Sequence, residues 1–221
     1  MASQTEENYL KSLYSLAMEK GEVNLTDLSS LMKVRLPTVN SMIKNLDRQG
    51  FVNYEKYKPV SLTEKGKKEA ALILRKHRLT EMYLVTKMGF GWEEVHDIAE
   101  QLEHIASTKL FDRMDELLEY PKTDPHGSQI PDKDGHLEWK ILEKLSECKT
   151  GDRVKLIALS HSTSDLLNFL NLHDLFLGTE LEIKSIEQFD KSMVVNYDNH
   201  LNEMFSQMVC NSLLIEHTKL M

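Results

Sequence analysis

The order of elements in the first 63 residues constrains the fold more than any other feature. Apolar residues recur at helical spacing over residues 6–19, and two shorter helical segments follow. The third segment begins near Pro37 and ends at Gly50. Alternating runs at residues 51–54 and 60–63 then predict two strands joined by a turn. Three helices with a tight turn before the third, followed by a hairpin, are typical of a winged helix-turn-helix.

A net charge of −8 argues at first against nucleic-acid binding, because nucleic-acid-binding surfaces are usually basic. The charge is uneven, however. Residues 1–70 hold 11 Lys and Arg against 9 Asp and Glu, whereas the rest of the chain holds 16 against 26. The predicted DNA-binding third is therefore not acidic. The acidic excess lies in residues 71–221, which also contain most of the candidate metal ligands.

The composition also excludes several classes of protein. The sequence has no run of 18 apolar residues, begins with polar and acidic residues, and contains two cysteines, Cys148 and Cys210. Two cysteines are too few for a disulfide framework, and both are expected to be small buried hydrophobes. We therefore expect a cytoplasmic protein that does not enter a membrane.

Beyond the hairpin, the sequence predicts a helical region and then a small β domain. Helical periodicity extends over residues 63–87 and, after a break at residues 89–91, from residue 92 to about residue 118, and turn-forming residues fill 120–131. A short helix is expected over residues 137–148, and short strands with one helix follow Gly151. The predicted fold class is mainly α with small β parts, ending in a barrel-like β domain.

One helical segment carries an unusual group of metal-ligand side chains. At roughly 100° per residue, four of them share an arc of about 100° on the segment predicted to be helical from residue 92: His96, Glu100, Glu103 and His104. A solvated acidic helix face is the alternative that this spacing alone leaves open.

A second pair, His77 and Glu81, favours the metal interpretation. These residues stand four apart on the preceding long helix and therefore share a face. If the two helices pack antiparallel, the two His/Glu faces converge. Oxygen and imidazole donors without a thiolate suit Mn²⁺ or Fe²⁺, although Zn²⁺ and Co²⁺ would also bind.

The chain resembles the diphtheria-toxin-repressor/manganese-transport-regulator family of metal-activated bacterial repressors. The resemblance rests on Arg-Lys-His-Arg-Leu-Thr-Glu at 75–81, on the His96 segment, on Asp-Pro-His-Gly at 124–127 and on Ile-Pro at 130–131. It implies a winged helix-turn-helix DNA-binding domain at 1–73 and a helical metal-binding and dimerisation domain at 74–138. A linker helix at 139–150 and an SH3-like β-barrel of FeoA type at 151–221 would complete the chain.

The resemblance also implies two metal sites. One maps onto Asn8, Glu100, Glu103 and His104, and the other onto His77, Glu81 and His96, often completed from the SH3-like domain. Asp165 and His161 are the nearest candidates there, and Asp165 is the one that we assign to the ligand set. Iron-responsive members tend to have Cys where this chain has Glu100, so Mn²⁺ is the expected metal and Fe²⁺ the alternative.

Two positions depart from the pattern of the manganese branch. Asn8 stands where that branch usually has Asp, and its amide oxygen can ligate but adds no charge. Lys11 stands where some short manganese regulators have a Glu ligand. Since a charged Lys cannot ligate, the two-metal cluster of those regulators is not expected here.

The resemblance implies a homodimeric repressor of metal-uptake genes that binds a palindromic double-stranded operator, and not an enzyme. Without metal, clustered Glu side chains are expected to repel one another. A cation would then fix the two recognition helices about 34–36 Å apart, or a multiple of that spacing. Polar and basic residues of the third helix and wing are expected to face DNA: Arg35, Pro37, Thr38, Asn40, Ser41, Lys44, Lys56 and Lys58.

Two other functions stay open at this point. One is a winged-helix regulator that answers a small organic effector, in which case the His/Glu faces are structural. The other is a metal-dependent hydrolase, which the sequence disfavours because no nucleophile or general-base motif accompanies the candidate ligands.

Overall fold

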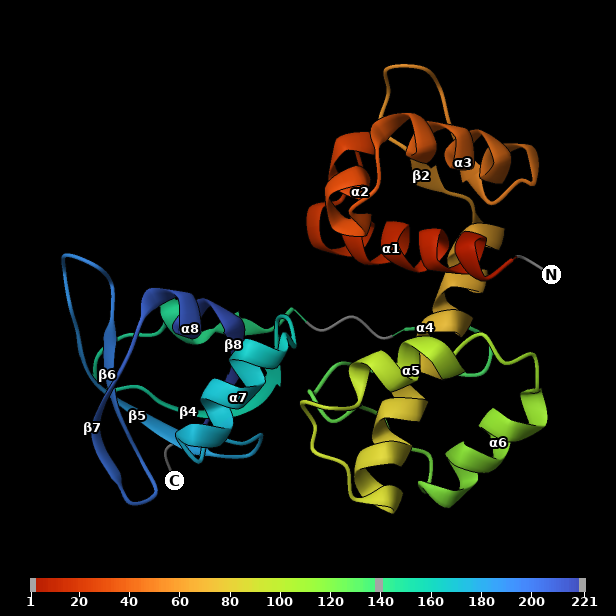
Figure 1. Ribbon diagram of the computed structural model, residues 1–221. Helices are drawn as coiled ribbons and strands as arrows, with labels where there is room; N and C mark the ends of the chain where they lie inside the picture. Colours follow the sequence, from red (N-terminus) through yellow and green to blue (C-terminus); the bar gives the residue numbers. More distant parts are fainter. Residues whose placement is uncertain (1–2, 138–140, 219–221) are drawn as a thin grey trace. The chain divides into compact units, whose positions relative to one another are not determined.

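The computed structural model describes residues 3–137 and 141–218, which belong to two compact units (Figure 1). The first unit, called here the helical unit, comprises Met1–Tyr83, Asp97–Lys122 and Ile130–Glu138. The second, called the sheet unit, comprises Leu84–His96, Thr123–Gln129 and Trp139–Met221. Each unit has its own buried apolar cluster. The predicted fold class is confirmed, with helices in the N-terminal part and a β-sheet in the C-terminal part.

Helix α1 (Gln4–Lys20) begins at a capping box formed by Ser3 and Glu6. The Ser3 hydroxyl accepts a hydrogen bond from the backbone N–H of Glu6 at 3.3 Å. The Glu6 carboxylate accepts one from the backbone N–H of Ser3 at 2.7 Å. The helix ends at Gly21, whose φ of 78° lies in the region that only glycine enters freely. The start and end of α1 are therefore both specified locally.

Helices α2 (Leu25–Met32) and α3 (Leu36–Arg48) form the helix-turn-helix. The turn between them contains Lys33 in the left-handed region, and Pro37 lies in the first turn of α3, where its missing N–H is not needed. On α3, Val39, Ile43 and Leu46 are fully buried, as the helical periodicity predicted. They pack in a core with residues of α1 and α2.

The wing consists of β1 (Val52–Asn53) and β2 (Ser61–Leu62), which pair antiparallel. Its base is held close to helix α4 (Glu64–Met88) by a glycine. A Cβ at Gly66 would lie 1.9 Å from the carbonyl oxygen of Phe51, so no other residue fits this contact without moving the backbone. The sequence therefore fixes the junction of wing and α4 at one position.

Two shorter helices, α5 (His96–Leu102) and α6 (Thr108–Leu117), follow α4. The sequence predicted one helix from residue 92 to beyond His104, but α5 is shorter at both ends. Residues 92–94 form a turn, and Glu103 and His104 lie in a turn after the last residue of α5. In the helical unit, Arg75 of α4 donates to the Pro131 carbonyl oxygen at 2.7 Å and pairs with Asp115 of α6.

The sheet unit contains a six-stranded antiparallel sheet with the order β3-β8-β4-β5-β6-β7. Its strands are β3 (Glu143–Lys144), β4 (Arg153–Leu159), β5 (Glu180–Ile186), β6 (Met193–Tyr197), β7 (His200–Phe205) and β8 (Leu213–His217). Helices α7 (Ser164–Leu172) and α8 (Gln207–Ser212) contribute to its core. Because β3 and β7 stand at the two ends of the hydrogen-bonded order, the sheet is not a closed barrel.

The segment that leads into the sheet differs from the expected helix over residues 137–148. Residues 138–140 lie outside the described residues, and the rest forms β3 followed by a single 3-10 turn, η1 (Leu145–Glu147). Leu145 and Cys148 are both buried and stand three residues apart, which places them on one side of a 3-10 turn. Pairing of β3 with β8 supplies backbone hydrogen bonds that a helix would otherwise make.

No helix among the described residues is both long and apolar enough to cross a membrane.

Candidate metal centre and nucleic-acid interface

Ionisable and amide side chains from α1, α4 and the α5 region meet inside the helical unit. We call this group the helical cluster. It consists of Glu7, Asn8, Lys11, His77, Glu81, Glu100, Glu103 and His104. Six of these residues were predicted as metal ligands from the sequence. Hydrogen bonds and ion pairs connect five of the six, and Asn8 is included because it lies on α1 between Glu7 and Lys11.

Glu103 lies at the centre of the helical cluster and is fully buried. Its backbone N–H still donates to the carbonyl oxygen of Ala99 at 2.9 Å, so the turn after α5 directs the side chain inward. The carboxylate accepts hydrogen bonds from Lys11 at 2.8 Å and from His77 at 2.6 Å. Although burial opposes ionisation, His77 and Lys11 lower the pKa of Glu103, so it is a carboxylate at neutral pH.

The Lys11 ammonium group sits between two of the predicted ligands. It forms ion pairs with Glu100 and with Glu103, and its side chain is only 12% exposed. The positive charge of Lys11, on α1, therefore already lies between the Glu100 and Glu103 carboxylates. The sequence showed that Lys11 cannot be a metal ligand while it is charged, but not that it would contact both carboxylates.

The His77 ring is held between two carboxylates. Its Nδ1 lies 2.6 Å from an oxygen of Glu103, and its Nε2 lies 3.0 Å from an oxygen of Glu81. Burial lowers the pKa of His77, but these two hydrogen bonds outweigh burial and raise the pKa to about 9. Both ring nitrogens therefore carry protons at neutral pH, and His77 is a second internal cation.

The helical cluster contains two internal cations, which the sequence prediction of mutually repelling Glu side chains did not include. Lys11 and the protonated His77 lie between the carboxylates and offset their charges. The physical reason is that carboxylates this deeply buried are retained only when paired. Glu103 is paired with residues 92 and 26 positions away in the sequence, whereas His77 and Glu81 are only four apart.

His104 and Asn8 complete the side of the cluster that α1 provides. His104 Nδ1 lies 2.6 Å from an oxygen of Glu7, a residue that the sequence analysis did not select. The signal for Glu7 was its spacing, because it stands four residues before Lys11 on the same face of α1.

Two oxygens of the helical cluster fit an additional cation. Among the described residues, Asn8 Oδ1 and Glu103 Oε1 are buried and accept no hydrogen bond. Glu103 Oε1 is nevertheless ion-paired, because Lys11 Nζ lies 2.8 Å from it. A buried amide oxygen without a donor is costly, and a hard divalent cation is a partner that would satisfy the Asn8 oxygen. With carboxylates and imidazole beside them, the donor set fits Mn²⁺ or Fe²⁺.

The other two predicted ligands belong to the sheet unit. His96 is the exposed first residue of α5, and Asp165 is exposed in the first turn of α7. His161, the other nearby candidate, is also exposed, and its Nδ1 lies 3.0 Å from the Ser160 hydroxyl. Their assignment as ligands stays a prediction.

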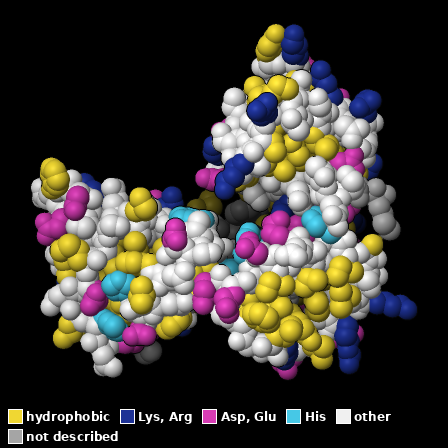
Figure 2. Space-filling model, in the orientation of Figure 1, with side chains coloured by type: hydrophobic (Ala, Val, Ile, Leu, Met, Phe, Trp, Pro, Cys, Tyr) yellow, Lys and Arg dark blue, Asp and Glu magenta, His cyan; other side chains and the backbone are white. Residues whose placement is uncertain are grey.

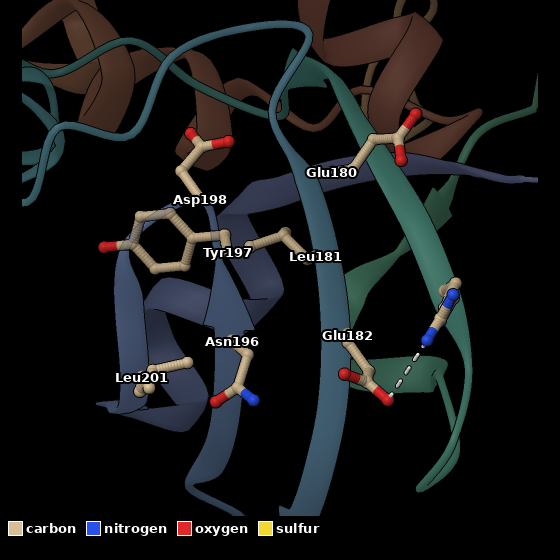
Figure 3. Close-up of a pocket in the computed structure, with 8 residues that line it drawn as sticks. Glu180, Leu181, Glu182, Asn196, Tyr197, Asp198 and Leu201 are labelled. Atoms are coloured by element: carbon tan, nitrogen blue, oxygen red, sulfur yellow. Dashed lines mark ion pairs between the residues drawn. The ribbon is translucent and has the colours of Figure 1, made fainter.

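The sheet unit also has an open hollow of about 310 Å³ over β4, β5 and β6 (Figure 3). Its lining includes the acidic residues Glu180, Glu182 and Asp198, and Glu182 forms an ion pair with Arg153 at 3.7 Å. None of the eight lining residues is His or Cys. The hollow therefore lacks the mixed donor set of the helical cluster.

The residues predicted to face DNA lie on α3 and on the wing. All are exposed except Asn40, which is half-buried and accepts a hydrogen bond from the Tyr54 hydroxyl at 2.8 Å. In Figure 2, Lys and Arg side chains gather over the part of the helical unit formed by α1–α3 and the wing. This surface is polar and basic, whereas the helical cluster is acidic and largely buried.

Two family models match the chain. The model described as the N-terminal DNA-binding domain of iron-dependent repressors matches residues 1–60. The model described as the metal-binding and dimerisation domain of iron-dependent repressors matches residues 63–132. The two matches together reach from the winged helix to the residues that follow α6.

Curated relatives match the same part of the chain. The iron-dependent repressor IdeR of Mycobacterium tuberculosis is 37% identical over 131 residues, which is 58% of this chain and 55% of that protein. The chain therefore matches only about half the length of this relative. The transcriptional regulator MntR of Bacillus subtilis is 32% identical over 124 residues, covering 56% of this chain and 87% of MntR.

Solved structures match nearly the whole chain. A manganese-dependent transcriptional repressor in complex with manganese has a TM-score of 0.87 and 28% identity, covering 96% of this chain and 100% of that chain. ScaR with bound Cd²⁺ has a TM-score of 0.81 and 32% identity, covering 96% and 98%. With the helix-turn-helix and the donor set, these matches show that the chain belongs to the diphtheria-toxin-repressor/manganese-transport-regulator family of metal-dependent transcriptional repressors.

Proposed function

We propose that this protein is a homodimeric, metal-activated transcriptional repressor that binds palindromic operators of metal-uptake genes, with Mn²⁺ as its effector and Fe²⁺ as the alternative. The observation that carries the proposal is the arrangement around Glu103. The fully buried Glu103 carboxylate is ion-paired with Lys11 of α1, and the buried amide oxygen of Asn8, on the same helix, accepts no hydrogen bond among the described residues. These groups favour one more positive charge at this place.

The proposed ligands are Asn8, Glu100, Glu103 and His104 for one ion, and His77, Glu81, His96 and Asp165 for a second. A bound divalent cation supplies two positive charges to the cluster. Glu100 and Glu103 would then release Lys11, and His77 would lose a proton before it could ligate, because its hydrogen bonds hold both ring nitrogens protonated. Glu100 in place of a thiolate favours the harder ion, Mn²⁺.

A continuous path of contacts supports coupling between the cluster and the recognition helix. Helix α1 carries Lys11 and Asn8, and it also carries Glu6 in its first turn. Glu6 accepts hydrogen bonds from Asn45 of α3 at 2.6 Å and from Gln49, just after α3, at 2.5 Å. Since α1 is one capped helix, a change in how the cluster holds α1 is transmitted to α3.

The proposed DNA contacts are divided by chemistry. Lys44, Lys56 and Lys58 are exposed and would neutralise phosphates, with Arg35 at the N-cap of α3. Thr38, Asn40 and Ser41 would approach base edges, and Pro37 sets the start of the helix that presents them. Two copies are needed to contact both halves of a palindrome.

Exposed apolar side chains in the α5–α6 part of the helical unit support a dimer. Ile105 is 37% exposed and Leu117 is 42% exposed, and Figure 2 shows a hydrophobic patch over this part of the unit. Exposed patches of this kind mark protein–protein contacts. A twofold-symmetric interface is the commonest way to bury such a patch.

The proposal is tested by selecting double-stranded fragments from a random-sequence library with the Mn²⁺-loaded protein. Affinity for the selected fragment is then measured with Mn²⁺, with Fe²⁺ under anaerobic conditions, and with chelator. We expect Mn²⁺ to tighten binding by about 10- to 100-fold, and DNA to tighten Mn²⁺ binding by the same factor. Equal affinity with Mn²⁺ and with chelator would contradict the proposal and favour an organic effector.

A further inference from the structure

A second group of metal-ligand side chains lies at the edge of the sheet unit, and we call it the sheet cluster. Glu143, Cys148 and His217 each offer one donor atom, and the three atoms all lie within 4.8 Å of one another. The Nε2 of His217 is 3.1 Å from a carboxylate oxygen of Glu143. This cluster combines a thiol, an imidazole and a carboxylate, a donor set that the helical cluster does not have.

The sheet register explains why these three residues meet. In the pairing of β3 with β8, Glu143 lies opposite Ile215, so the two side chains point to the same face of the sheet. His217 is two residues beyond Ile215 on β8 and therefore shares that face. Ile215 is buried in the core. Glu143 and His217 thus lie at the rim of the core face, and η1 brings Cys148 to the same place.

The Cys148 sulfur is buried but weakly partnered. The residue is 4% exposed, and among the described residues its Sγ makes one long hydrogen-bond contact, of 3.9 Å, to the carbonyl oxygen of Lys144. Burial, together with the carboxylates of Glu143, Asp152 and Glu147, raises the pKa of the thiol to about 12. Those carboxylates give the sheet cluster a negative surrounding that attracts a cation.

We propose that Glu143, Cys148 and His217 form a Zn²⁺ site that is separate from the helical cluster. Ligand atoms that share one Zn²⁺ lie roughly 3–4 Å apart, since Zn–N and Zn–S distances are about 2.0–2.3 Å. The observed separations need only small adjustments to reach this range. On binding, the Cys148 thiol releases its proton to solvent and its sulfur becomes a thiolate ligand.

A metal here would fasten the first strand of the sheet to the last. Strand β3 pairs with β8 over only two residue pairs, Glu143 with Ile215 and Lys144 with Leu214. A bridge from Glu143 and Cys148 to His217 would add a third connection between these segments. The sheet unit should then melt at a higher temperature with Zn²⁺ than without it.

The test is a titration of the full-length, chelator-treated protein with Co²⁺, followed by Zn²⁺. A thiolate bound to Co²⁺ gives a charge-transfer absorption in the near ultraviolet, which oxygen and imidazole ligands do not give. Because the helical cluster contains no cysteine, Co²⁺ bound there is silent in this band. We expect the band to appear with Co²⁺ and to disappear when Zn²⁺ replaces it.

Three variants locate the site. Cys148→Ser should abolish the band, whereas Cys210→Ser is the matched control, a second buried cysteine of the same core, and should retain it. His217→Ala should weaken Co²⁺ binding at least about tenfold without disturbing the core, because His217 is exposed. That variant keeps the proposal testable even if Cys148→Ser does not fold.

Absence of the band in the unmodified protein with excess Co²⁺ would overturn the proposal. So would a band that survives Cys148→Ser, or an unchanged Co²⁺ affinity in His217→Ala. Binding of Mn²⁺ at the helical cluster is read separately by the electron paramagnetic resonance of the ion. Failure of the zinc site is therefore distinguishable from failure of the repressor proposal.

Discussion

The helical unit holds ionisable side chains in two opposite ways. In the helical cluster, the largely buried Lys11 and the buried His77 form short hydrogen bonds with carboxylates. On α3 and the wing, Lys44 and its polar neighbours are exposed to solvent. The first arrangement is suited to responding to a bound cation, and the second to neutralising the phosphates of DNA. Response to metal and contact with DNA can therefore be changed independently, except through α1, which contacts both regions.

The largest expected effect comes from Glu103→Ala, which removes the carboxylate shared by Lys11 and His77. Mn²⁺ affinity should fall at least about 100-fold, and loss of a partner for buried charges should cost about 3–5 kcal/mol of stability. Mn²⁺ titration and thermal unfolding measure the two effects. Glu116→Gln, on the exposed part of α6, is the control and should change neither. Unchanged Mn²⁺ affinity in Glu103→Ala would remove the cluster from the metal site.

The next effect has the opposite sign and tests whether Lys11 competes with metal. Lys11→Met keeps the length of the side chain but removes its charge, so Glu100 and Glu103 lose their internal counter-ion. Mn²⁺ affinity should rise about tenfold, equivalent to about 1.4 kcal/mol, while the metal-free protein becomes less stable. Mn²⁺ titration and thermal melts in chelator check both changes.

Lys109→Met, on the exposed side of α6, is the matched control for Lys11→Met and should leave Mn²⁺ affinity unchanged. Weaker Mn²⁺ binding in Lys11→Met would show instead that Lys11 stabilises the metal-bound state.

A smaller effect is expected where the two regions are joined. Glu6→Ala removes both the capping box of α1 and the hydrogen bonds to Asn45 and Gln49. Ser3→Ala removes only the cap, at a cost of about 1 kcal/mol. Operator affinity at saturating Mn²⁺ should therefore fall several-fold more in Glu6→Ala than in Ser3→Ala.

Mn²⁺ affinity in the absence of DNA should stay within about twofold in both variants, since neither residue is a proposed ligand. Equal operator affinity in the two variants would show that the bonds from Glu6 to α3 carry no coupling.

The smallest expected effect is confined to the exposed region. Lys44→Ala should lower the slope of log affinity against log salt by about one, as expected for loss of one phosphate contact. Mn²⁺ binding should not change. Operator binding measured across a salt series, with Lys109→Ala as the control, gives the slope. An unaltered slope would place Lys44 outside the phosphate contacts.

The same contrast explains what the sequence could predict. The exposed face of α3 follows from a local period, because Val39, Ile43 and Leu46 define the buried side and the remaining positions must face outward. Pro37, Gly21 and the capping box mark helix ends within a few residues. Local signals of this kind sufficed for the winged helix and for the presence of short strands after Gly151.

The helical cluster could be predicted only in part. Spacing identified Glu100, Glu103 and His104, but their contacts with Lys11 and Glu7 join residues 89 to 97 positions apart in the sequence. No local period reports such contacts. The predicted helix also continued past Leu102, whereas Glu103 lies in a turn, and its buried charge is met by Lys11 and His77. Tertiary pairing decided the geometry there, as it did for β3, whose two residue pairs with β8 replaced an expected helix.

The position of Lys11 has a consequence for the concentration at which such a sensor responds. An amine tethered to α1 is a competitor of fixed local concentration, which neither dilution nor export from the cell can change. Each metal ion must outcompete this attached charge, whatever else the cell contains. The side chain at position 11 would then set the metal concentration at which repression begins. Substitutions at that position would be a direct way for evolution to shift this concentration.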